Sequence, residues 1–376
     1  MSQRSRRSRF RSSGPLVSLT VVIAVLAATA LTAFGLGIAD KAVAVYNASS
    51  WVWSTRSGEL SRINGIKGSV DTRTKVKDSQ GHEVQVTQSD RYLIIRDLTT
   101  GVITSIDLST LQVAATLNSV PGFGISLALH NDVAFVIDSL QGVVRQVDPL
   151  TLVPLGHPIQ FPPGLRGGEF DSEGRLWLLV PSEGTVLAVR AGRGAADPAV
   201  MHTYSVTDPQ HDVSLSVLDK GVAILDHTLA TLVTIRDGIV KKLKLPTAKS
   251  SALPNRTSGA HIPVTVADDR CVYVINQGTV REFEVPAEQG QGLRPAVAWA
   301  GWFYVADTLG DSVYVLDGEG STVDRLRIKG GAGLELEVRD SHLFINPPGG
   351  DTATVIDEDH TSTPVPKFPK GIPGGE

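Results

Sequence analysis

Ionisable side chains recur immediately before short apolar segments of this chain. Imidazoles and carboxylates dominate the set, which consists of His82, Glu83, Glu169, His211, Asp212, His261, Arg294, Glu335 and Glu337. If these positions converge on one ring, they could hold a divalent cation or polarise a substrate carbonyl. The alternative is a hydrated polar channel whose side chains satisfy one another and bound water. We favour the hydrated channel, so the set is a candidate ring and not an assigned active site.

Sequence motifs that would specify a reaction are missing. The chain has no His-x-His, no His-Glu-x-x-His, no Gly-x-Ser-x-Gly and no calcium-binding loop of alternating acids. We therefore assign no catalytic residue, metal ligand or cofactor, and a divalent cation in the channel stays open as an alternative. The single cysteine, Cys271, begins an apolar run and is interpreted as a small buried hydrophobe.

Eight copies of one short pattern position these residues. Each copy has an apolar strand, a polar turn and a second strand, followed by Asp or Asn with Thr or Gly close behind. The second strands are interpreted as starting at Trp51, Tyr92, Ala134, Leu176, Val222, Val272, Phe303 and Leu343, at steps of 41, 42, 42, 46, 50, 31 and 40 residues. A period of about 40 residues filled with short strands is typical of a β-propeller, whose blades bury their faces only against neighbouring blades.

The pattern therefore predicts an all-β chain in which residues 42–363 form a β-propeller of about eight four-stranded blades. Seven blades remain an alternative, because the first repeat must use Lys41–Tyr46 as its innermost strand. Innermost strands line the channel of a propeller, so we expect the ionisable set to meet at one mouth. An Asp or Asn that closes six repeats is predicted to form a tight turn, by bonding the backbone two residues on or by adopting positive φ. These residues are Asn64, Asp107, Asp148, Asp237, Asp317 and Asp357.

The amino terminus predicts a membrane anchor. Residues 16–39 form an uncharged apolar stretch that follows five arginines, at Arg4, Arg6, Arg7, Arg9 and Arg11. These 24 residues exceed the roughly 20 that a helix needs to cross a bilayer. Arginines hold their flank in the cytoplasm, so residues 1–15 are predicted to be a cytoplasmic tail and the propeller to lie outside the plasma membrane. A signal peptide cleaved after Ala42-Val43-Ala44 is the alternative.

Charge restricts the partners of the predicted propeller. The chain carries a net charge of −4, and residues 1–39 contribute five arginines and no acid, so the remainder carries −9. This balance argues against nucleic acid or anionic lipid as a partner of that remainder. The bilayer is the expected partner of residues 16–39, whereas the sequence does not specify a ligand for the propeller.

The carboxyl terminus is rich in Pro, Lys and Gly. Residues 364–376 show no apolar period. Such a tract is predicted to be an extended linker or tail, of the kind that leads to a further module.

The chain resembles a family of actinobacterial single-pass membrane proteins that are labelled fibronectin type III domain-containing. The resemblance covers nearly the whole sequence and is carried by the arginine-rich start and by Val45–Trp53, Gly58–Gly65 and Val84–Asp90. Members of that family continue through a Pro/Lys-rich linker into fibronectin-like modules, which this sequence does not contain. The resemblance implies a membrane-anchored propeller without an established activity, and it provides no catalytic residues.

Two functions from different classes follow from these observations. The first, which we adopt, is a binding or scaffolding module at the cell envelope that engages polymers or other proteins. The second is an extracytoplasmic hydrolase or lyase that acts on a polysaccharide or lactone at the channel mouth. The short phrases Gly174–Trp177 and Val147–Thr151 resemble lactonase and streptogramin-lyase propellers, but they are common in blades of many kinds. The second function predicts that His82, His211, His261 and Glu169 cluster together.

Overall fold

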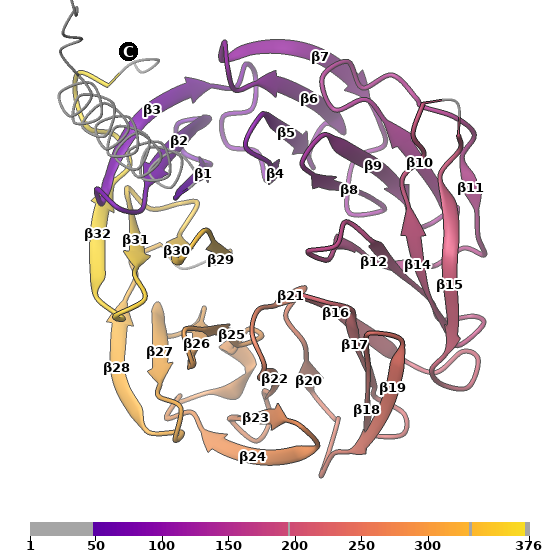
Figure 1. Ribbon diagram of the computed structural model, residues 1–376. Helices are drawn as coiled ribbons and strands as arrows, with labels where there is room; N and C mark the ends of the chain where they lie inside the picture. Colours follow the sequence, from indigo (N-terminus) through magenta and orange to yellow (C-terminus); the bar gives the residue numbers. More distant parts are fainter. Residues whose placement is uncertain (1–47, 195, 331–332, 373–376) are drawn as a thin grey trace, which may run out of the picture. The chain divides into compact units, whose positions relative to one another are not determined.

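Eight β-sheets surround a central axis in the part of the chain that follows residue 47 (Figure 1). The computed structural model describes residues 48–194, 196–330 and 333–372. These residues form 32 strands and one short 3-10 helix, η1 (Gly290–Gly292). The prediction of an all-β propeller with eight blades is therefore confirmed. The predicted tail and membrane helix, residues 1–15 and 16–39, lie outside the described residues, and within the described residues no helix is long and apolar enough to cross a bilayer.

The first four blades are consecutive along the chain, and each is an antiparallel sheet. Blade 1 contains β1 (Ser49–Ser54), β2 (Glu59–Asn64) and β3 (Ser69–Lys75); blade 2 contains β4 (Val84–Gln88), β5 (Tyr92–Asp97), β6 (Val102–Asp107) and β7 (Gln112–Asn118). Blade 3 contains β8 (Ile125–His130), β9 (Val133–Asp138), β10 (Val143–Val147) and β11 (Ile159–Gln160); blade 4 contains β12 (Arg166–Phe170), β13 (Leu176–Val180), β14 (Thr185–Arg190) and β15 (Ala199–Ser205).

The last four blades continue in the same way, with one exchange between neighbours. Blade 5 contains β16 (Val213–Leu218), β17 (Val222–Asp226), β18 (Thr231–Arg236) and β19 (Ile239–Lys244), and β21 (Arg256–Thr257) joins it in parallel to β16. Blade 6 contains β20 (Ser251–Ala252), β22 (Ile262–Val266), β23 (Cys271–Asn276) and β24 (Thr279–Glu284). Blade 7 contains β25 (Val297–Trp299), β26 (Trp302–Asp307), β27 (Ser312–Leu316) and β28 (Thr322–Arg327); blade 8 contains β29 (Glu335–Arg339), β30 (His342–Asn346), β31 (Thr352–Ile356) and β32 (Ser362–Pro366).

The two faces of the ring follow from this strand order. The innermost strands of blades 2 to 8 all begin on one face, which we call the N-face. Because each blade is a meander, the connection between its second and third strands returns to the N-face. The connections between first and second strands, and between third and fourth strands, lie on the opposite C-face. A residue that precedes a first strand is therefore on the N-face, whereas one that precedes a second strand is on the C-face.

The predicted second strands are confirmed in six blades and wrong in one. In blades 2, 3, 4, 5, 7 and 8 the second strand begins within one residue of the predicted position. In blade 6 the sheet order β20-β22-β23-β24 places Val272 in the third strand, and the second strand begins at Ile262. The steps from Val222 to Ile262 and from Ile262 to Trp302 are then both 40 residues. The sequence was ambiguous because β22 and β23 are both short buried strands, and an apolar run does not specify its order in a blade.

Blade 1 has three strands among the described residues. Trp51 lies in β1, and β1 borders the channel. The segment Lys41–Tyr46, which was expected to supply the innermost strand, lies outside the described residues.

The Asp and Asn residues that close the repeats form turns as predicted. Asp237 has a φ of 50°, and the other five accept hydrogen bonds from backbone N–H groups two or three residues on. The N–O distances are 2.8 Å for Asp107–Ser109, 3.0 Å for Asp148–Leu150, 2.9 Å for Asp317–Glu319, 3.0 Å for Asp357–Asp359 and 2.9 Å for Asn64–Lys67. These acids therefore serve the connections between strands.

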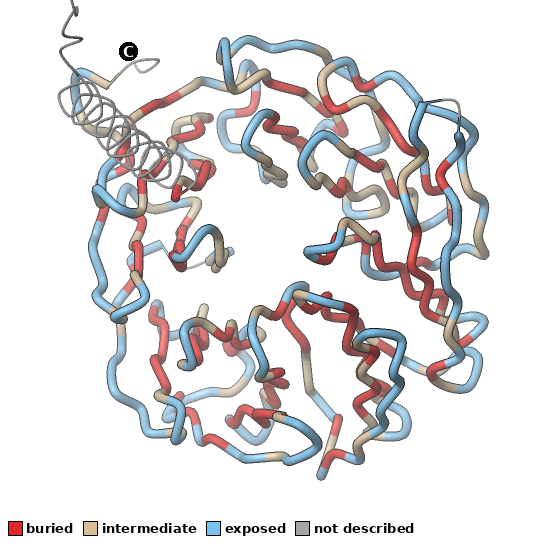
Figure 2. The backbone as a smooth tube through the Cα atoms, viewed as in Figure 1, coloured by how far each residue is buried: buried red, intermediate tan, exposed pale blue. Residues whose placement is uncertain are grey.

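The core consists of apolar layers between adjacent blades. In one such layer Trp177 and Val186 of blade 4 pack with Val213, Val222 and Ile224 of blade 5. Figure 2 shows the burial concentrated in the middle strands, while most of the outermost strands are exposed. Each blade therefore depends on its neighbours for the removal of apolar surface from water, as the 40-residue period implies.

The predicted boundary at residue 364 is too early. Residues 362–366 form β32, in which Val365 is fully buried. Lys367 is also fully buried, and its carbonyl oxygen accepts a hydrogen bond from Ser61 Oγ in blade 1 at 2.9 Å. This strand was not predicted because prolines flank Val365 on both sides and the strand buries only one side chain. This part of the tract therefore belongs to the propeller and connects blade 8 to blade 1.

Candidate functional site

A polar channel of about 960 Å³ lies inside the ring. Side chains from blades 1 to 8 line it, and charged and amide groups are prominent among them. The polar lining includes Gln85, Gln88, Asp90, His130, Asn131, Glu169, Asn255, Arg256, Arg294, Glu335, Glu337, Arg339, Asp340 and Asn346. The channel therefore presents hydrogen-bond donors and acceptors of both signs of charge.

Part of the predicted ring lies in this channel. Glu169 on β12, Arg294 before β25, and Glu335 and Glu337 on β29 all line it. Gln85, Glu169, Asn255 and Arg294 have side chains without a hydrogen bond or ion pair to any other described residue. These groups are accessible to a molecule that enters the channel.

The histidines of blades 2 and 5 are bound within their own blades. His82 Nδ1 lies 2.6 Å from Asp97 Oδ2, and His211 Nδ1 lies 2.8 Å from Asp226 Oδ2. Both acids are the last residues of second strands and are buried. These imidazoles therefore connect the N-face start of a first strand to the end of the second strand.

The third histidine of the predicted ring lies on the other face. His261 directly precedes β22, the second strand of its blade, so it is on the C-face and not the N-face. Its Nε2 lies 3.2 Å from Asn276 Nδ2, and its ring packs edge-on against Phe303. The expectation of one mouth was therefore wrong for His261, because the sequence had assigned the strands of blade 6 incorrectly.

Two further members of the predicted set are outside the channel lining. Glu83 is exposed, and the Asp212 carboxylate forms an ion pair with Arg166 at 3.0 Å. The structure thus brings Glu169, Arg294 and Glu335 to the channel and leaves His82, Glu83, His211, Asp212 and His261 away from it. In the described residues, no group of three His, Cys, Asp or Glu side chains is placed to hold a metal ion.

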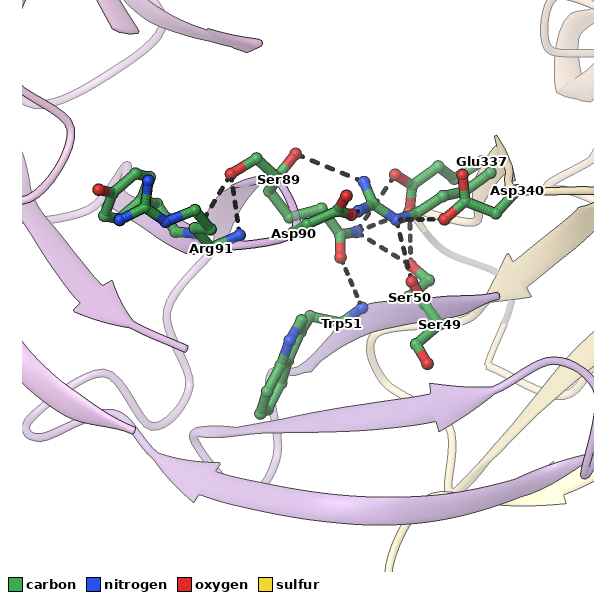
Figure 3. Close-up of polar contacts among 11 residues, drawn as sticks. Ser49, Ser50, Trp51, Ser89, Asp90, Arg91, Glu337 and Asp340 are labelled. Carbon is green, nitrogen blue, oxygen red and sulfur yellow. Dashed lines mark hydrogen bonds and ion pairs between the residues drawn. The ribbon is translucent and has the colours of Figure 1, made fainter. Parts of the chain in front are cut away.

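A hydrogen-bonded network joins blades 8, 1 and 2 at the channel wall (Figure 3). Ser50 Oγ donates to Glu337 Oε2 at 2.6 Å, and Gln88 Nε2 donates to the same oxygen at 3.0 Å. The channel-side edge of β1 is bound by side chains of its neighbours: Trp51 N–H donates to Gln88 Oε1 at 2.9 Å, and Arg339 Nε donates to Ser49 O at 3.0 Å. This side-chain network satisfies backbone groups of the strand that borders the channel in blade 1.

The channel wall shifts the ionisation of its acids. Burial raises the pKa of Glu169 to about 7, with Arg256 opposing the shift and Glu337 adding to it. Burial also raises the pKa of Glu335 to about 7, although a hydrogen bond from Asn346 opposes this. Both side chains line the channel, where Glu169 is partly buried and Glu335 is the more exposed of the two. The charged form of each acid is therefore less stable here than in free solution.

Sequence reasoning missed Arg256. This residue lies in the long connection from β20 to β22, which turns into the channel and adds β21 to blade 5. Arg256 Nη1 donates to Phe170 O at 2.6 Å, which places the guanidinium beside blade 4. The segment is held by Val217 N–H, which donates to Asn255 O at 2.9 Å, and by the Ser216–Thr257 hydroxyl pair at 2.8 Å. The sequence held no signal for Arg256, because the 50-residue step after Val222 came from taking the third strand of blade 6 as its second, and the true step to Ile262 is 40 residues.

The comparisons with known proteins show the fold alone. The sequence matches no protein-family model and no curated protein. Among solved structures, dihydro-heme d1 dehydrogenase NirN is similar with a TM-score of 0.61 at 13% identity, over 86% of this chain and 74% of that protein. BamB from Moraxella catarrhalis is similar with a TM-score of 0.57 at 18% identity, over 82% and 93%. Virginiamycin B lyase from Staphylococcus aureus is similar with a TM-score of 0.52 at 11% identity, over 74% and 97%. The chain is therefore a propeller of a shape shared by proteins with different names and activities.

Proposed function

We propose that this chain is a membrane-anchored, extracytoplasmic propeller that acts as a binding or scaffolding module at the cell envelope. Its ligand site is the central channel, and its ligand is a polar segment of an envelope polymer or protein. The proposal includes residues 16–39 as the anchor and the relationship to actinobacterial single-pass membrane proteins that the sequence indicates.

One observation supports the channel as the binding site. Gln85, Glu169, Asn255 and Arg294 reach the cavity with no side-chain hydrogen bond or ion pair to any described residue, and they come from different parts of the ring. Amide, carboxylate and guanidinium groups together can bind hydroxyl, amide or ionic groups of a ligand. The imidazoles of His82 and His211 are bound to acids of their own blades, so they contribute to folding rather than to the channel.

The experiment measures binding of fractionated soluble envelope polymers to the full chain in lipid nanodiscs. The channel variant combines Asn255→Ala with Arg294→Ala. We expect at least a tenfold weaker association, because two accessible polar groups are lost from the lining while the buried layers are unchanged.

His211→Ala is the control, since this residue lies outside the channel lining. We expect it to retain binding. Equal binding by the wild type and the channel variant would show that the ligand does not bind in the channel. A wild-type chain that binds none of the fractions would contradict the binding function.

A hydrolase or lyase is the second candidate, and a specific observation favours it. Glu169 and Glu335 both have a pKa of about 7, a value suited to general acid–base chemistry at neutral pH. Turnover of polysaccharide or lactone substrates by the wild type, lost in Glu169→Gln or Glu335→Gln, would establish this candidate in place of the first.

A further inference from the structure

Four connections on the N-face of blades 2 to 4 contain no charged residue. They are Leu98–Gly101, Ser119–Gly124, Ser139–Gly142 and Phe161–Leu165, which we call the uncharged loop surface. On the C-face, the connections of the same three blades carry nine charged residues, at Asp90, Arg91, Asp132, Asp148, Asp171, Glu173, Arg175, Arg193 and Asp197. The other two N-face connections of these blades, Val76–Glu83 and Pro181–Gly184, carry Lys77, Asp78, Glu83 and Glu183, so the absence of charge is confined to the uncharged loop surface.

The uncharged loop surface also exposes large apolar side chains. Phe123 is 76% exposed, Leu140 is 71% exposed and Val120 is 64% exposed. Among the large apolar side chains of the described residues, these three are the most exposed. The N-face also carries exposed Leu229 and Leu309 on blades 5 and 7. Exposed apolar groups that gather in one place mark an interaction surface.

Backbone hydrogen bonds join the four connections into one rigid unit. Ser119 N–H donates to Gly101 O at 3.0 Å, Ser139 N–H donates to Gly124 O at 2.8 Å, and Phe161 N–H donates to Gly142 O at 2.8 Å. Gly164 N–H donates to Ser139 O at 2.7 Å. The apolar tips are therefore presented by a continuous hydrogen-bonded surface and not by independent loops.

A buried arginine fixes the central loop from below. Arg96 is fully buried on β5, and its Nη2 donates to Val120 O at 3.0 Å and to Gly122 O at 2.6 Å. These bonds hold the backbone of the Ser119–Gly124 loop, while the side chains of Val120 and Phe123 remain exposed. A loop that is held in this way loses little conformational entropy when its tips are buried.

We propose that the uncharged loop surface contacts the lipid bilayer that anchors the chain, with Val120, Phe123 and Leu140 entering the interfacial layer. The inference rests on the proposed function, because it requires the anchor at residues 16–39. Only residues 40–47 separate that anchor from Ala48, and eight residues span at most about 29 Å. The propeller is therefore held at the membrane surface, where its local concentration favours contact with lipid.

Residues 40–47 are long enough for the propeller to contact the bilayer through either face, and the side chains on the two faces determine which face does so. A six-residue strand rises by about 20 Å, which is less than the reach of these residues. Apolar and aromatic side chains favour the interfacial layer, whereas charged turns favour water. The uncharged loop surface places no acid against anionic headgroups, so this part of the N-face, and not the charged C-face turns, is the part that meets the bilayer.

The test uses the full chain in bilayer nanodiscs with a nitroxide label on single introduced cysteines. The native Cys271 is buried and does not compete for the label. Labels at Phe123→Cys and Leu140→Cys are expected to lose access to a water-soluble nickel relaxant and to gain access to oxygen. Val153→Cys is the matched control, since Val153 is 56% exposed on the C-face of blade 3, and its label is expected to retain access to nickel.

The outcomes separate this inference from the proposed function. A flotation assay of the chain with lipid tests the anchor separately. If the chain is recovered with lipid but the labels at positions 123 and 140 remain accessible to nickel, the lipid contact is wrong and the anchor stands. If the chain does not float with lipid, both proposals are overturned. Labels that become immobilised only at higher protein density would identify a second copy as the partner and would also overturn the lipid contact.

Discussion

At the scale of a single residue, the channel changes the pKa of the Glu169 carboxyl group. Its carboxylate lacks a hydrogen bond to any described group, and burial raises its pKa from 4.5 to about 7. Between these two values the folded chain binds more protons at Glu169 than the unfolded chain does. The contribution of Glu169 to stability is therefore full below about pH 4.5 and is lost as the pH rises to about 7.

Replacing Glu169 by Gln should remove this loss. At pH 8 we expect the free energy of unfolding to rise by about 1–2 kcal/mol, a figure reduced for the water in the channel. At pH 4.5 the variant and the wild type should be nearly equal, because the wild-type carboxyl is then protonated. Urea unfolding at the two pH values measures the difference.

Glu358→Gln is the control, because Glu358 is exposed in a turn of blade 8. It should leave the dependence on pH unchanged. A Glu169→Gln variant that is less stable than the wild type at pH 8 would show that the folded chain stabilises the charged carboxylate, which is the opposite of the expected effect of burial.

At the scale of elements, the connections between strands determine the lining of the channel and the packing on the N-face more than the strands themselves do. The turns closed by Asp and Asn are regular, whereas the β20–β22 connection enters the channel and supplies Arg256. Glycines allow neighbouring connections on the N-face to lie close together. Gly142 has a φ of 73°, and a Cβ atom at this position would lie 2.2 Å from Phe161 O.

Gly142→Ala should therefore destabilise the fold. Both the positive φ and the contact with a backbone oxygen oppose a side chain, and we expect a loss of about 2–4 kcal/mol in the free energy of unfolding. Gly122→Ala is the matched control on the same surface, with a φ of 87° and no described heavy atom within 4 Å of the added Cβ. It should lose only about 1 kcal/mol. Equal losses in urea unfolding would show that the conformation, and not the close approach, determines the cost.

At the scale of the whole molecule, the proposal fixes which parts of the chain face each side of the membrane. In intact cells a membrane-impermeant maleimide should label Val153→Cys, because this exposed position belongs to the propeller. Gln3→Cys should react only after the cells are permeabilised, because in the proposed orientation the amino terminus with its five arginines lies on the cytoplasmic side. Protection of Val153→Cys in intact cells, with labelling after permeabilisation, would place the propeller in the cytoplasm.

The sequence by itself determined the class of fold and most of the strands. A 40-residue period, turn acids such as Asp107 and Asp357, and apolar runs are local signals, and each can be interpreted without its neighbours in space. The same local signals predicted Glu169, Arg294 and Glu335 as residues of the channel.

Only the tertiary structure decided how the blades meet. The order of strands in blade 6, the position of His261 on the C-face and the role of Arg256 depend on which strands pair, and an apolar run does not encode its partner. The burial of Val365 and Lys367 likewise depends on the contact between blade 8 and blade 1, about 300 residues apart in sequence. Long-range packing leaves no periodic trace in the residues that it brings together, so the channel and the uncharged loop surface became visible only in three dimensions.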